Sequence, residues 1–149
     1  MQIKEQITDY LNLLEMKHAW NEKKGRFELV FTERKDEKPA SSSADDEEQF
    51  KYTICIQPTD KWVQVYCDVL PLKEVSPEVR QDLFLDLLAM NRKYAEVCFD
   101  FDKKRQVIGT SQEMMVQGFH FDSFRAEFLA VPWAVKRFWT EIAEKYNLK

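Results

Sequence analysis

The sequence predicts an α+β fold with a five-stranded, mainly antiparallel sheet and three principal helices. Apolar residues recur at helical spacing in three segments, and they alternate with polar residues in five others. The segments follow the order α-β-β-β-α-β-β-α, and polar turns or loops separate neighbouring strands. With 149 residues and a hydrophobic content of 44%, we expect a single domain over residues 1–149.

The first helix is predicted over residues 2–19. Its polar face mixes acidic and basic side chains, which favours packing against a core over binding to a membrane surface. One stripe of that helix is apolar and consists of Ile3, Ile7, Tyr10, Leu11 and Leu14.

Three strands are expected next, over residues 26–32, 50–57 and 62–69, because apolar and polar residues alternate in each. Residues 33–48 separate the first two strands and contain no apolar residue larger than alanine. This segment has seven acidic and three basic residues, so it cannot bury enough surface to offset its ordering entropy. We expect a mobile acidic loop; an acidic tether for a basic partner is the alternative.

The third strand carries the best candidate for a binding surface. Its valines suit the core, which places Trp62 and Tyr66 together on the opposite face. Large aromatic side chains in that position either pack under another element or form a surface for a partner. Trp62 and Tyr66 are therefore the predicted partner-binding residues.

A helix followed by a hairpin is predicted in the middle of the chain. Ser76 is a suitable N-cap before Pro77, and the helical spacing of apolar residues continues to Asn91. Alternation then marks a strand at 97–102, and a polar turn leads to a return strand at Val107–Ile108.

The last segment is unusually aromatic. Asp122 is a plausible N-cap for a helix that carries Phe124 and Phe128, and we expect Pro132 to kink or restart that helix. The aromatic residues that follow at helical spacing need a large apolar surface, either the sheet or a second subunit. This requirement is the reason for predicting a homodimer.

Composition excludes several function classes. The net charge of −4 gives no footprint for a phosphate backbone, so we expect no nucleic-acid partner. Only three glycines are present and no glycine-rich phosphate motif occurs. No apolar run approaches the length of a membrane span, and the N-terminus lacks a signal-peptide core; we expect a cytoplasmic protein that has no membrane association.

Signals for catalysis and for cofactors are weak. His18 and His120 lack a second histidine at the spacing of a zinc-binding helix, and Asp100 and Asp102 lack a third oxygen ligand. The odd number of cysteines, without a Cys-x-x-Cys pair, favours reduced strand residues: Cys55, Cys67 and Cys98. We expect no catalytic residues, no metal and no cofactor.

The element order resembles the type III secretion chaperone-like fold, which the CesT-class chaperones and the YbjN-like proteins share. The residues that carry the resemblance are Leu87-Leu88-x-x-Asn91, then Val97-Cys98-Phe99-Asp100-Phe101-Asp102, then Val107-Ile108 and the helix with Phe124 and Phe128. It covers nearly the whole chain. The sequence departs from the pattern in its Lys103-Lys104 turn, its acidic loop and its longer C-terminal helix.

The resemblance implies a binding role, in which helix and sheet surfaces hold a client or partner protein, commonly in a dimer. The sequence thus favours a non-catalytic protein-binding module, either chaperone-like or regulatory. The alternative from another class is a small-molecule-binding or enzymatic domain. Its pocket would lie between the sheet and the C-terminal helix and would be lined by Phe128, Trp133 and Trp139.

Overall fold

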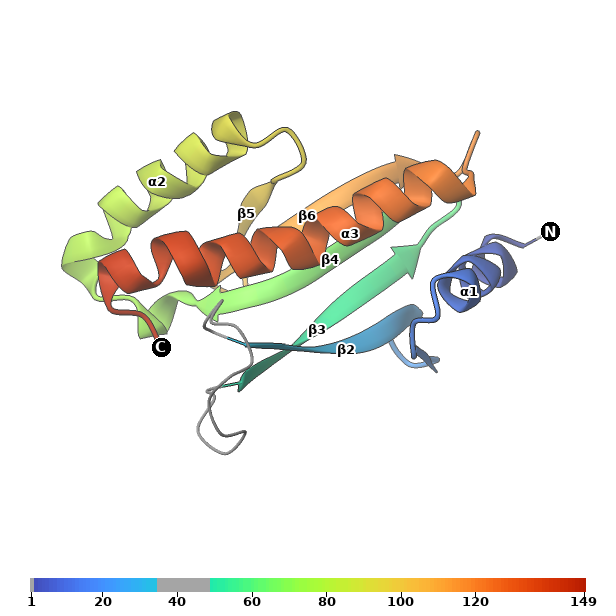
Figure 1. Ribbon diagram of the computed structural model, residues 1–149, viewed down its shortest axis with the longest axis horizontal. Coiled ribbons are helices and arrows are strands. Elements are labelled where there is room, and N and C mark those ends of the chain that lie inside the picture. Colours follow the sequence, from blue (N-terminus) through green and yellow to red (C-terminus); the bar gives the residue numbers. More distant parts are fainter. Residues whose placement is uncertain (1, 35–48) are drawn as a thin grey trace, which may run out of the picture.

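The computed structural model describes residues 2–34 and 49–149. It consists of a six-stranded antiparallel sheet with three α-helices on one face. The strand order is β1-β2-β3-β4-β6-β5. In Figure 1, α3 runs along the sheet while α2 and α1 lie toward its two ends. The elements are α1 (Ile3–Leu13), β1 (Ala19–Asn21), β2 (Arg26–Arg34), β3 (Gln49–Pro58), β4 (Trp62–Pro71), α2 (Arg80–Lys93), β5 (Phe99–Asp102), β6 (Val107–Met115) and α3 (Phe121–Arg137).

The core lies between the sheet and the helices, in two adjoining clusters. One joins α1 and the first part of α3 to β2, β3 and β4, and the other joins α2 and the end of α3 to the β5–β6 hairpin. Val63, Val65 and Cys67 are buried, as the alternation in the sequence predicts. The predicted α+β class and the three helices are therefore confirmed.

The prediction of five strands is wrong because it missed β1. The first helix ends at Leu13, and Glu15 adopts a left-handed backbone conformation with φ of 56°. The chain then pairs Ala19–Asn21 with the start of β2 and packs Trp20 against Phe27, whose ring lies 4.8 Å away. Three residues are too short to show alternation, so pairing with β2 creates this strand.

The middle helix and hairpin form as predicted, with shifted ends. Pro77–Val79 is a 3₁₀ turn, α2 follows it, and the side chain of Ser76 makes no capping hydrogen bond. Asn91 attaches the last turn of α2 to β5: its Nδ2 donates to the Phe99 carbonyl at 3.0 Å, and the Phe99 N–H donates to Asn91 Oδ1 at 2.7 Å.

The C-terminal helix starts and continues differently from the prediction. His120, not Asp122, is its N-cap, and its Nδ1 accepts from the Ser123 N–H. Pro132 does not restart α3, which runs on to Arg137 and is followed by a π-helical turn at Phe138–Ile142. The ribbon of α3 is continuous in Figure 1.

The C-terminal aromatic residues find their apolar surface within the chain itself. Phe124, Phe128 and Phe138 are fully buried, and the ring of Trp139 packs against those of Phe138 and Phe50, at 5.2 and 5.7 Å. The aromatic content therefore does not by itself require a second subunit. Most of the predicted acidic loop, residues 35–48, lies outside the described residues, and Glu33 and Arg34 belong to β2.

Candidate partner-binding face

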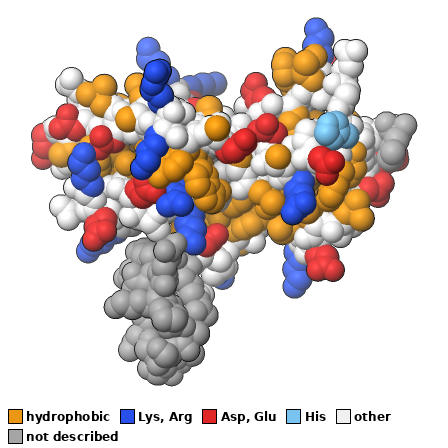
Figure 2. All heavy atoms as spheres, turned by 45° about the horizontal axis from the view of Figure 1, so that its top comes forward, with side chains coloured by type: hydrophobic (Ala, Val, Ile, Leu, Met, Phe, Trp, Pro, Cys, Tyr) orange, Lys and Arg blue, Asp and Glu red, His pale blue; other side chains and the backbone are white. Residues whose placement is uncertain are grey.

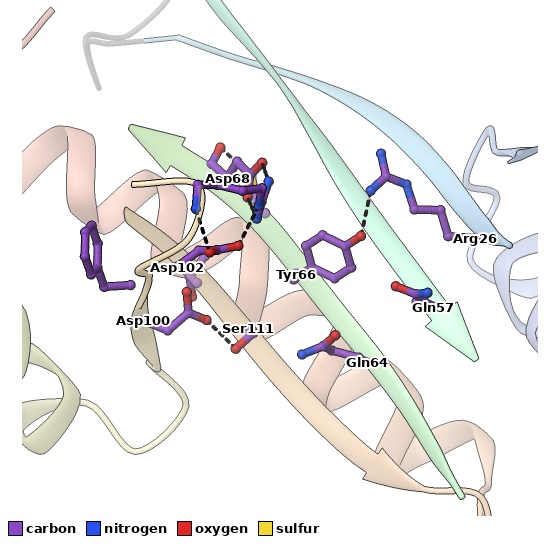
Figure 3. Close-up of a pocket in the computed structure, with 12 residues that line it drawn as sticks. Arg26, Gln57, Gln64, Tyr66, Asp68, Asp100, Asp102 and Ser111 are labelled. Atoms are coloured by element: carbon purple, nitrogen blue, oxygen red, sulfur yellow. Dashed lines mark hydrogen bonds and ion pairs between the residues drawn. The ribbon is translucent and has the colours of Figure 1, made fainter. Parts of the chain in front are cut away.

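The face of the sheet that points away from the helices is not covered by any described element. We call this surface the open face. Figure 3 looks onto part of it, with the helices behind the strands. The side chains that alternate with the core residues and so form it are Arg26, Glu28, Val30, Thr53, Cys55, Gln57, Trp62, Gln64, Tyr66, Asp68, Asp100, Asp102, Ser111, Glu113 and Met115.

The two predicted binding residues both lie on the open face, in different surroundings. Trp62 begins β4, is 44% exposed and stands opposite Met115, which is 54% exposed. Tyr66 is half-buried in the middle of the sheet, with Gln64 between it and Trp62. The apolar part of the face is thus at the Trp62 end, and the polar part begins at Tyr66.

Tyr66 is held by an arginine from another strand. Arg26 on β2 donates from Nη1 to the Tyr66 hydroxyl at 2.6 Å, and its Nε and Nη2 donate to Glu28 Oε1 at 2.9 and 2.7 Å. Figure 3 shows the Tyr66 ring lying between β4 and Arg26. Burial raises the pKa of Tyr66, although the hydrogen bond from Arg26 opposes this rise. Tyr66 is therefore a neutral, fixed hydrogen-bonding group at neutral pH.

A shallow depression of about 460 Å³ lies beside Tyr66 and extends to the β5–β6 hairpin. Arg105 closes one end by donating to both carboxylate oxygens of Asp68, at 2.6 and 3.0 Å, and to Asp102 Oδ2 at 2.5 Å. The backbone N–H groups of Lys104 and Arg105 also donate to Asp102 Oδ1. These bonds fix the hairpin turn against β4.

Asp100 lies inside this depression, over a glycine. A β-carbon at Gly109 would lie 2.9 Å from Asp100 Oδ1, so the carboxylate occupies the space that another side chain would need. Ser111 Oγ donates to Asp100 Oδ2 at 2.6 Å. Desolvation raises the pKa of Asp100, and the charges of Asp68 and Asp102 add to the rise.

The cysteine thiols of the sheet region are not activated nucleophiles. Burial raises the pKa of the thiols of Cys55 and Cys98, and that of Cys67 to about 12, which disfavours the nucleophilic thiolate. Within residues 2–34 and 49–149, no group of three or more His, Cys, Asp or Glu side chains is arranged to hold a metal ion.

The aromatic residues of the alternative pocket lie in three different surroundings. Phe128 is a core residue whose ring stacks on Phe124 at 5.6 Å, and Trp139 belongs to the π-helical turn and packs on Phe138 and Phe50. Trp133 lies on the outer side of α3 beside Tyr94.

The comparisons with known proteins bear on the fold. No family model matches the chain, and no curated protein matches it. Several solved structures superpose on most of it, among them YbjN from E. coli, with 14% identity, a TM-score of 0.60 and coverage of 97% of this chain and 92% of that one. The HopA1–SchA chaperone–effector complex has 14% identity, a TM-score of 0.53 and coverage of 89% of this chain and 88% of that one. The ExoU–SpcU complex of the type III secretion system of Pseudomonas aeruginosa has 12% identity, a TM-score of 0.54 and coverage of 89% of this chain and 96% of that one.

The chain has the type III secretion chaperone-like fold. The resemblance inferred from the sequence is therefore confirmed at the level of fold. At 12–14% identity, the comparisons do not transfer a function to residues of this chain.

Sequence reasoning proposed Trp62 and Tyr66 as binding residues and did not select the polar residues near Tyr66. Arg26 bonds to Tyr66 and Arg105 bonds to Asp68 only because β2, β4 and the hairpin turn, far apart in sequence, bring these side chains onto one face. The only sequence signal for Arg26 was its outward position in an alternating strand, which marks a face and does not identify a partner.

Proposed function

We propose that this protein is a non-catalytic protein-binding module, chaperone-like or regulatory, that holds a segment of a client on the open face of its sheet. The observation that carries the proposal is the uncovered face itself, with an exposed apolar pair, Trp62 and Met115, beside a fixed polar centre at Tyr66. Two of the three superposed structures are complexes between two proteins, which supports a binding role for this fold.

The arrangement suits an extended client segment. β1 pairs only with Arg26–Glu28, so within the described residues the outer edge of β2 from Leu29 onward has no strand partner. An added strand there would gain main-chain hydrogen bonds, and side chains on one side of it would reach the open face next to Val30, which is 69% exposed. A further part of the client that crosses the open face to β4 and β6 would place apolar residues on Trp62 and Met115 and polar residues on Tyr66 and Gln64.

We place the protein in the cytoplasm and assign it no catalytic step and no cofactor. The three cysteines have free thiols, of which those of Cys55 and Cys67 are buried, and this is compatible with a reducing compartment. No helix in the described part of the chain combines the length and apolar character that crossing a membrane requires.

A homodimer is part of the proposal, and an exposed apolar surface on α2 supports it. The outer side of α2 exposes Leu85 and Leu88, at 57% and 63%, and Phe101 extends this apolar surface from β5 through its contact with Phe84 at 5.3 Å. Light scattering at high micromolar concentration should give twice 17.8 kDa, and Leu85→Ser/Leu88→Ser should return the monomer mass. A wild-type mass near 17.8 kDa would remove the dimer from the proposal.

The test of the binding role is a tagged pull-down from native lysate with wild type beside Trp62→Ser/Tyr66→Ser. A protein recovered in near-equal amount with wild type should be lost with the variant. Leu13→Ser, at a 67% exposed position on α1, is the matched control and should retain the partner. Because Tyr66 is half-buried, Trp62→Ser/Met115→Ser is a second variant that leaves the Arg26 hydrogen bond intact. Equal recovery with both folded variants would refute the assignment of the open face.

A further inference from the structure

A groove of about 430 Å³ lies on the helical side of the molecule, between the end of α2 and the outer side of α3. In Figure 1 the chain that follows α2 comes down beside the middle of α3. This surface is separate from the open face, which lies on the other side of the sheet. Its lining residues are Lys93, Tyr94, Ala95, Glu96, Ala126, Leu129, Ala130 and Trp133.

The floor of the groove is apolar and firmly built. Ala126 and Ala130 are small, so they leave a hollow between Leu129, which is 36% exposed, and Trp133. The Trp133 ring is fixed by an edge-to-face contact with Tyr94, with centroids 5.1 Å apart and planes at 90°. The volume is at the low end for binding pockets and suits one or two side chains.

The two cations near the groove, Arg137 and Lys93, share one carboxylate, that of Glu141. Arg137 Nη1 lies 2.8 Å from Glu141 Oε1, and Lys93 Nζ lies 3.9 Å from Glu141 Oε2. Arg137 also covers the Trp133 ring, with 4.9 Å between its guanidinium carbon and the ring centroid. Figure 2 shows basic and acidic side chains interspersed with apolar patches on this side of the molecule.

The negative charges on the opposite rim are not neutralised. Within residues 2–34 and 49–149, the carboxylates of Glu96 and Glu127 have neither an ion pair nor a hydrogen bond. The segment of Glu96 is held by Gln112, whose Nε2 donates to the Glu96 carbonyl at 2.7 Å. Burial raises the pKa of Glu127, and the charge of Glu96 raises it further, so the two carboxylates repel each other beside the apolar hollow.

We propose that this groove binds a peptide segment of a partner protein that presents an aliphatic side chain next to a lysine or arginine. The aliphatic side chain fills the hollow between Leu129 and Trp133, and the cation lies against the carboxylate of Glu96, close to Glu127 on α3. An acidic side chain beside Glu96 is disfavoured because it would add a third negative charge at this rim. The inference rests on the proposed protein-binding role and gives it a second contact surface with a defined chemistry.

The test is an NMR titration of the full chain with two acetylated, amidated peptides, Gly-Ser-Leu-Lys-Leu-Lys-Ser-Gly and the same peptide with glutamate in place of lysine. The lysine peptide should shift the backbone amides of Ala95, Ala126 and Ala130 and the indole signal of Trp133, which Trp133→Phe identifies. Its affinity should fall about threefold to tenfold in Glu96→Gln/Glu127→Gln, as the loss of two exposed ion pairs implies. The glutamate peptide should shift none of these signals.

Glu74→Gln/Glu78→Gln is the matched control, since it removes the same charge at two exposed positions outside the groove and should bind the lysine peptide as wild type does. Equal shifts with both peptides, or no shift of the groove signals at millimolar peptide, would overturn the inference. The titration is judged by the groove signals on the helical side, and the pull-down is judged by variants of the open face. Failure of one is therefore distinguishable from failure of the other.

Discussion

Asn91 provides the strongest test of how the helical layer is joined to the edge of the sheet. Its side-chain amide makes two hydrogen bonds with the backbone of Phe99, at 2.7 and 3.0 Å, much as a neighbouring strand would. Phe99 is only 6% exposed, so Asn91→Ala would leave a nearly buried N–H and C=O without partners. Each such group costs about 1–3 kcal/mol.

We expect Asn91→Ala to lower the free energy of unfolding by about 2 kcal/mol, at the low end for two groups because water can enter the space left by the half-buried side chain. In a domain of this size, the melting temperature should fall by about 4–8 °C. Urea unfolding gives the free energy, and hydrogen exchange of the Phe99 amide reports the local effect.

Asn12→Ala is the matched control, because Asn12 is exposed on α1, and it should leave the stability unchanged or slightly raised by the better helix propensity of alanine. A change below about 0.5 kcal/mol in Asn91→Ala, the range of ordinary surface substitutions, would show that these two hydrogen bonds do not secure β5. Unchanged protection of the Phe99 amide would contradict the reasoning independently.

Three further predictions concern the open face and the thiols. Gly109→Ala should lower the free energy of unfolding by about 1–3 kcal/mol in urea, because the new β-carbon would lie 3.0 Å from the Cys67 carbonyl oxygen, which is backbone and cannot rotate away. Asp100→Asn should raise the melting temperature more at pH 7 than at pH 3. The pKa of the Asp100 carboxyl is raised, so the ionised carboxylate is disfavoured in the folded state. This destabilisation is present above that pKa and disappears as the carboxyl group is protonated. An equal effect at both pH values would contradict the desolvation of Asp100. An aromatic disulfide reagent should modify one thiol in the native protein, the exposed Cys98, and all three after denaturation; rapid native reaction of Cys55 or Cys67 would show that the sheet opens around them.

The sequence by itself determined the periodic elements and their order. Strand β4 is an example: Val63, Val65 and Cys67 alternate with outward residues, and a period of two admits only one division between core and surface. The same reasoning placed Trp62 and Tyr66 on the side away from the core. It also gave the helix–hairpin unit after Ser76 and, with it, the fold.

Only the tertiary structure decided which faces are covered and which side chains meet. β1 exists because Ala19–Asn21 pairs with β2, and its three residues carry no periodic signal of their own. The C-terminal aromatic residues pack in the core of their own chain. Their helical spacing shows that they need an apolar surface but does not show whether the sheet or a second subunit provides it. The pairs Arg26–Tyr66 and Asp68–Arg105 depend on strand register, which contacts distant in sequence establish.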